Sequence, residues 1–205
     1  MTDESTENNE DAAWVTIETP FGSAELRAFL DDVERLYRIN SMLEFEEWQQ
    51  TGDRQYRLKA KNLSNGKQLE TDLDVELTAD GITVRYNEGL RTSTSFRVDD
   101  EVGGCAKLVV TDDYSGCSFT ERESRIDEVD KSLVYWGNSL YRYLHQWKRW
   151  SWLPGWKLYM RKIWQPMKPM ARRITFILIM ITLVEFVFFL MVFTIFWLEL
   201  DKYIN

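Results

Sequence analysis

The chain has 205 residues, of which 44% are hydrophobic and 28% charged, so it is long enough to bury one core. Its slightly polar mean hydropathy excludes a polytopic transporter. Residues 1–130 carry 30 acidic and 14 basic side chains, residues 131–173 carry 10 basic and no acidic ones, and an apolar segment follows. That order predicts an acidic soluble head, a membrane-facing collar and an anchor.

The first 13 residues are polar and acidic, which predicts a disordered tail. They show neither the basic region nor the apolar run of a signal peptide, so we expect the head to stay in the cytosol.

The head begins with a β-type run at 14–18, closed by Pro20-Phe21-Gly22. Ser23 is then expected to cap a helical segment, which can break into two short helices near Asp31-Asp32. One face of this segment is apolar, formed by Leu26, Phe29, Leu30, Val33, Leu36 and Tyr37.

After Asn40 the hydrophobic period changes from 3.6 to 2, which indicates strands. Turn signals such as Asn65-Gly66 and Asp80-Gly81 separate the runs, so we expect an antiparallel meander. The candidate strands are 43–50, 55–62, 69–78, 81–87, 91–98 and 105–112.

A long helix is predicted from about Thr120 into the basic region. Its apolar residues recur at steps of three and four, which forms one stripe suited to covering a curved sheet. The stripe consists of Ile126, Val129, Leu133, Trp136, Leu140, Tyr143 or Leu144, and Trp147.

This order of elements, and the run from Val15 to Asn40 followed by MLEFEEW, resembles the SRPBCC superfamily of START and polyketide cyclase-like proteins. The resemblance covers about residues 14–150 and implies an α+β helix-grip fold, a curved antiparallel sheet of about seven strands around a long C-terminal helix. It also implies an apolar ligand between sheet and helix. By facing pattern, the candidate cavity residues are Leu36, Tyr37, Phe45, Tyr56, Leu58, Leu73, Val75, Trp136 and Leu140.

Catalytic and metal-binding patterns are not found in the sequence. The single histidine, His145, is interpreted as an interfacial polar residue, and Cys105 and Cys117 as ordinary thiols without a disulfide or zinc site. The many carboxylates along the strands, Asp112 among them, are interpreted as a solvated outer face. We therefore expect no cofactor, and a cyclase-like enzyme acting on an apolar substrate has no support from a motif.

Residues 151–173 form a basic, Trp-rich segment, interpreted as a membrane-interface collar and not as a nucleic-acid site. An amphipathic helix is expected after Pro154-Gly155, ended by Pro166 and Pro169. The predicted interface residues are Trp147, Arg149, Trp150, Trp152, Trp156, Arg161, Lys162, Trp164, Arg172 and Arg173.

Residues 174–198 contain one charge, Glu185, and predict a transmembrane helix, followed by a short external tail at 199–205. Basic residues concentrate before this span, so the head is predicted to be cytoplasmic and the protein a single-pass, tail-anchored protein of the inner or cytoplasmic membrane. Near the bilayer centre a carboxyl group is unfavourable, so Glu185 and Thr182 are predicted to contact a transmembrane partner or a second copy.

Three hypotheses follow. The first is a membrane-tethered START-like module that binds a lipid or another apolar ligand at the cytoplasmic leaflet. The second is an accessory subunit of a membrane complex, with a cavity filled by side chains. The third is a cyclase-like enzyme.

Overall fold

The computed structural model describes residues 12–89, 91–99, 104–116 and 119–204. Cys117 and residues 1–11 of the tail predicted at 1–13 lie outside the described residues. Ala12 and Ala13, the last two residues of that predicted tail, instead belong to a strand, paired with Asp113 and Asp112. The chain divides into two compact units, Met1–Pro166 and Met167–Asn205.

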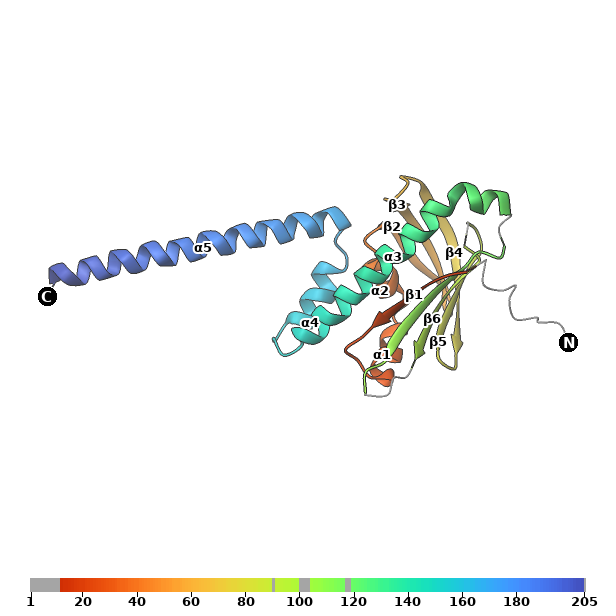
Figure 1. The fold of residues 1–205 in the computed structure, drawn as a ribbon, viewed down its shortest axis with the longest axis horizontal. Helices are drawn as coiled ribbons and strands as arrows, with labels where there is room; N and C mark the ends of the chain where they lie inside the picture. The colour runs from red at the N-terminus through yellow and green to blue at the C-terminus, as the bar shows by residue number, and fades with distance from the viewer. Residues whose placement is uncertain (1–11, 90, 100–103, 117–118, 205) are drawn as a thin grey trace. The chain divides into compact units, whose positions relative to one another are not determined.

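The first unit is built on a seven-stranded antiparallel sheet of order β1-β7-β6-β5-β4-β3-β2 (Figure 1). Strands β2 to β7 follow one another as the predicted meander, and β1 closes the sheet beside β7. Two register shifts in β2 bend it. The strands are β1 (Ala12–Glu18), β2 (Leu43–Gly52), β3 (Gln55–Asn62), β4 (Gln68–Thr78), β5 (Gly81–Tyr86), β6 (Ser93–Asp99) and β7 (Lys107–Asp113).

Two short helices, α1 (Ser23–Leu30) and α2 (Val33–Ile39), connect β1 to β2. The predicted break at Asp31-Asp32 is confirmed: Asp32 is the N-cap of α2, and its side chain accepts a hydrogen bond from the backbone N–H of Arg35 at 3.1 Å. The cap explains why one amphipathic pattern forms two helices.

The predicted long helix is α3 (Phe119–Arg149), which packs against β1 and α2 (Figure 1). Its buried stripe continues through Leu133, Trp136, Leu140 and Tyr143. Gly137 permits the close approach to β1, since a Cβ atom there would lie only 3.0 Å from Cγ2 of Val15. The helix-grip architecture expected from the sequence is therefore present.

After α3 the chain forms a short helix, α4 (Trp156–Tyr159), and a π-helical turn, η2 (Met160–Trp164). The sequence predicted one amphipathic helix lying in a membrane interface. Instead, Met160 is 1% exposed and belongs to the core of the domain, with Trp156, Tyr159 and Trp164 packed against it. A large part of the apolar face is thus used inside the first unit.

The second unit contains one helix, α5 (Pro169–Ile204). Proline is favoured in the first turn of a helix because its missing N–H is not needed there, so Pro169 starts α5. The most apolar 18-residue stretch within Pro169–Leu200 has a mean hydropathy of 2.8, and none of that stretch is buried. By length and composition it can cross a membrane. The helix includes the predicted span at 174–198 and continues through most of the segment predicted as a tail.

Candidate functional site

Six of the nine predicted cavity residues lie in the packed interior between sheet and helices. Each of the six is at most 1% exposed. Side chains that lined a void large enough for a water molecule would have more accessible surface than this. They therefore pack against other side chains and not around an open space. These residues are Leu36, Tyr37, Leu58, Leu73, Trp136 and Leu140.

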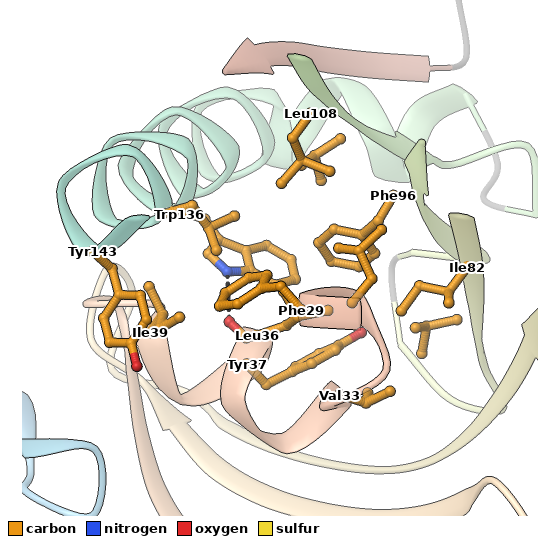
Figure 2. Packing of buried hydrophobic residues seen from close by; sticks show 14 of the residues in the cluster. Phe29, Val33, Leu36, Tyr37, Ile39, Ile82, Phe96, Leu108, Trp136 and Tyr143 are labelled. Carbon is orange, nitrogen blue, oxygen red and sulfur yellow. Dashed lines mark hydrogen bonds between the residues drawn. The ribbon is translucent and has the colours of Figure 1, made fainter. Parts of the chain in front are cut away.

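Trp136 fills the centre of this interior (Figure 2). Its indole N–H donates to the carbonyl oxygen of Leu36 at 3.0 Å. Its ring lies 5.1 Å from that of Tyr37 and 5.3 Å from that of Phe96, the latter edge-on. These aromatic contacts and the hydrogen bond fix the indole in place, so Trp136 fills the middle of the space between the sheet and α3.

A buried polar cluster beside Trp136 was not predicted from the sequence. Asp112 has no exposed surface, and it accepts hydrogen bonds from Arg91 Nη1 at 3.1 Å, Thr94 Oγ1 at 2.5 Å and Tyr114 Oη at 3.2 Å. Tyr86 connects Thr94, at 3.0 Å, to the hydroxyl of Tyr37, at 2.5 Å. The cluster thus joins β5, β6 and β7 to α2.

The interpretation of Asp112 as a solvated carboxylate is therefore wrong. Along β7, Leu108, Val110 and Asp112 alternate with residues of the other face, and all three are fully buried. A strand places every second side chain on one face, so the alternation itself was a signal that could have placed Asp112 inside.

Burial sets the protonation of the cluster. It raises the pKa of Tyr37, of Tyr86 and of Tyr114, so these three phenols are neutral over the physiological range. Burial by itself lowers the pKa of Arg91, but the negative charge of Asp112 holds it above its ordinary value. An ion pair surrounded by neutral hydroxyl groups is the result.

An open cleft lies at a different place, between the α1–α2 junction and strands β2 to β5. It has a volume of about 410 Å³, within the usual range of small-molecule sites of about 300–1,000 Å³. The exposed apolar and aromatic surface comes from Leu77 and Tyr56, and the polar groups come from Asp31, Gln50, Asp53 and Arg54. Four further apolar residues border the cleft but are each at most 9% exposed: Leu30, Val33, Val75 and Ile82. An adjoining hollow of about 340 Å³ shares Val33 and Tyr56 and includes Trp48.

Only Tyr56 and Val75 of the predicted cavity residues line this cleft. The remaining one, Phe45, is partly buried, 6.1 Å from the Trp48 ring, with the guanidinium carbon of Arg38 4.9 Å from its own ring. The ligand-binding role of all nine stays a prediction.

No cluster suited to metal binding, with three or more His, Cys, Asp or Glu side chains, is found among the described residues. The His145 ring lies tilted against that of Tyr141 with centroids 4.1 Å apart, and its Nδ1 lies 2.9 Å from the Tyr141 carbonyl oxygen. Cys105 is a free, exposed thiol.

The predicted membrane-interface residues separate into two groups. Trp147, Trp156 and Trp164 are partly buried against the core, whereas Trp150 and Trp152 are 39% and 73% exposed. Arg149, Arg161 and Lys162 are exposed in the first unit, and Arg172 and Arg173 belong to α5. Contact with a membrane surface stays a prediction for all of them.

The fold is found in solved structures. A START superfamily protein from Mycobacterium smegmatis is 15% identical, with a TM-score of 0.51 over 66% of this chain and 98% of its own. The Zhui aromatase/cyclase from a Streptomyces species is 14% identical, with a TM-score of 0.53 over 70% and 97% of the two chains. A protein from Thermus thermophilus is 13% identical, with a TM-score of 0.52 over 66% and 97%.

The first unit therefore has the helix-grip fold of START and polyketide cyclase-like proteins, joined to a helix long and apolar enough to span a membrane. At these identities the likeness concerns the fold alone. No family model matches the sequence, and no curated protein matches it.

Proposed function

We propose that this protein is a membrane-tethered START-like module that binds the apolar part of a small or lipid-like molecule. The observation that carries the proposal is the cleft of about 410 Å³ lined by Leu30, Val33, Tyr56, Val75, Leu77 and Ile82. Its apolar surface beside charged groups suits an amphipathic ligand, with the apolar portion inside and polar groups near Asp31, Asp53 or Arg54.

Filling the cleft tests this proposal. Leu77 is 52% exposed, so Leu77→Trp can occupy the cleft without disturbing the core, and Leu63→Trp, at a position 40% exposed outside the cleft lining, is the matched control. The full chain is purified in a gentle uncharged detergent, and its organic extract is analysed by mass spectrometry. We expect a near-stoichiometric apolar molecule in the wild type, reduced at least tenfold by Leu77→Trp and unchanged by Leu63→Trp.

If the wild type carries no apolar molecule, or if both variants lose it equally, the proposal is wrong.

The location proposed for this module is the cytoplasmic side of an inner or cytoplasmic membrane. The apolar helix Pro169–Leu200 supports the tethering, and the excess of Lys and Arg before it supports a cytoplasmic first unit. Cys105 is exposed and serves as a reporter. In intact cells, an impermeant thiol reagent should miss Cys105 and label a cysteine introduced at Asn205; labelling of Cys105 would reverse the orientation.

A second candidate function is that of an accessory subunit whose fold is a docking surface. Two observations favour it: the interior around Trp136 is filled, and the apolar helix carries Glu185 near the middle of Pro169–Leu200. A carboxyl group at that depth is stabilised by a partner that hydrogen-bonds or pairs with it, and Thr182 lies one turn earlier on nearly the same face.

Glu185→Leu tests this second function. We expect it to abolish co-purification of a membrane protein partner, or of a differently tagged second copy, while the protein remains in the membrane. Glu199→Leu removes the other acidic residue of the candidate span, near its end, and should leave the partner bound. Retention of every partner by Glu185→Leu would contradict the predicted contact.

A further inference from the structure

A second buried arginine, on α2, does not take part in the hydrogen bonds of the polar cluster. Arg35 is 3% exposed, and its guanidinium carbon lies 4.5 Å from the ring centroid of Phe29, 5.1 Å from that of Tyr143 and 4.1 Å from that of Trp147. Its Nε donates to the Tyr143 hydroxyl at 3.0 Å, but its buried Nη2 has no hydrogen-bond partner. The surroundings of Arg35 are therefore aromatic and lack an acceptor for Nη2.

Within the described part of the chain, no ion pair to a carboxylate is formed by Arg35. The acid next to it in the helix cap, Asp32, uses its side-chain oxygen to accept the backbone N–H of Arg35. A buried guanidinium without a counter-charge is unfavourable, and an unpaired buried donor adds to that. Three aromatic rings offset part of the desolvation but supply no oxygen atom.

A second cation lies against the same tryptophan. The guanidinium carbon of Arg161 is 5.9 Å from the ring centroid of Trp147. Burial, and to a smaller extent the charge of Arg161, lower the pKa of Arg35. Like charges repel, and an anion that reaches both groups would offset this repulsion.

The turn that carries Arg161 has an uncommon backbone. η2 is π-helical, and the N–H of Gln165 donates to the carbonyl oxygen of Met160, five residues earlier, at 3.0 Å. This turn places the Trp164 ring 5.4 Å from the ring of Tyr143, the residue that contacts Arg35. π-Helical turns are rare in proteins, and a large share of those that occur lie at functional sites.

We propose that Arg35 and Arg161 form a binding site for a phosphate group. Guanidinium groups present several N–H donors in one plane, which match the oxygen atoms of phosphate, and two such groups match its charge. Arg161 is exposed and forms the solvent side of the site, and the anion supplies the acceptor that Arg35 Nη2 lacks. The phosphate comes from a phospholipid headgroup or from free phosphate. None of these residues lines the cleft, so the proposal is independent of the proposed function.

The test measures thermal unfolding of the full chain in an uncharged detergent at constant ionic strength. The chain is titrated separately with inorganic phosphate and with dihexanoyl phosphatidic acid. A ligand that binds only the folded state raises the Tm as its concentration rises, so we expect a saturable increase in the wild type. A response to the short-chain lipid alone assigns the site to a headgroup, and an equal response to inorganic phosphate assigns it to free phosphate.

Four variants locate the response. Arg161→Gln changes an exposed residue and should weaken binding about tenfold, and Arg35→Met should abolish the response. Arg149→Gln is the matched control, because that exposed arginine lies 5.7 Å from the Trp150 ring and not against Trp147. Leu77→Trp should also respond as the wild type does, which separates this site from the cleft.

No response to either ligand overturns the proposal, and so does an unchanged response in Arg161→Gln. If Arg35→Met does not fold, Arg161→Gln decides alone.

Discussion

Arg91 and Arg35 are both largely buried in the first unit, yet their surroundings differ in kind. The side chain of Arg91 is 16% exposed and pairs with Asp112 at 3.1 Å, and Asp112 is held by two further hydroxyl donors. Arg35 is 3% exposed and contacts three aromatic rings and a single hydroxyl group. The first arginine has its anion within the fold, and the second does not.

This difference separates a polar group that stabilises the fold from one that is available to a ligand. A satisfied buried cluster gains from a low dielectric and fixes one arrangement of its strands, whereas an unsatisfied one retains the capacity to bind. If this is the physical distinction, the two arginines must respond differently to the same substitution.

The largest effect is expected at Asp112. Asp112→Ala leaves the Arg91 guanidinium buried without its counter-charge and removes the acceptor of Thr94 and Tyr114, so the free energy of unfolding should fall by about 3–5 kcal/mol. Urea denaturation followed by tryptophan fluorescence measures it. Asp99→Ala breaks the exposed pair with Arg97 and should have a far smaller effect. Equal losses would mean that the Asp112 cluster is not a stabilising unit.

The direct comparison is between Arg91→Met and Arg35→Met. Arg91→Met leaves Asp112 unpaired, so it should again remove about 3–5 kcal/mol. Arg35→Met leaves no charge behind and places a flexible apolar side chain among aromatic rings, so its loss should stay below about 2 kcal/mol in phosphate-free buffer. Urea denaturation midpoints of the two variants decide, and a larger loss at Arg35 would assign that residue a purely structural role.

Local patterns in the sequence predict most of the architecture but little of either arginine site. The period-two runs place the strands, and Asp32 with its capping potential explains the break between α1 and α2. The burial of Asp112 was predictable from its alternation with Leu108 and Val110, and was missed because residue type was weighted above register. Arg35 had no such signal, because its contacts with Tyr143 and Trp147 join residues more than 100 positions apart.

Local sequence patterns also failed to predict how the cavity residues and the collar residues pack. Facing pattern identifies side chains that point inward, as Trp136 and Leu140 do, but it does not show whether they enclose space or fill it. In the collar, composition predicted a membrane surface for Trp156 and Trp164, which pack against the core instead. A helix face suited to a bilayer is equally suited to packing against its own domain.

Alkaline pH should weaken the Arg91 cluster. Burial raises the pKa of Tyr37 and of Tyr86, so above about pH 10 the unfolded chain releases these protons while the folded chain retains them. The free energy of unfolding therefore falls as pH rises, by about 1.4 kcal/mol per pH unit for each such tyrosine. Urea midpoints between pH 9 and 11 should show this slope, and Tyr86→Phe should make it shallower. An unchanged slope in that variant would remove Tyr86 from the titrating set.

The smallest effect is expected at a third arginine, Arg57, which supplies the exposed reference for the other two. Its Nε donates to Asp72 at 2.9 Å on the surface of the sheet, with the two side chains 50% and 45% exposed. The hydrogen bond from Arg57 lowers the pKa of Asp72, so the pair contributes stability above about pH 4, and this contribution is lost as the pH falls below that value. Water and salt screen an exposed pair, so Arg57→Gln should cause only a small loss at pH 7, and raised salt should remove the difference from the wild type. A salt-insensitive loss comparable to that of Asp112→Ala would show that burial is not what distinguishes these arginines.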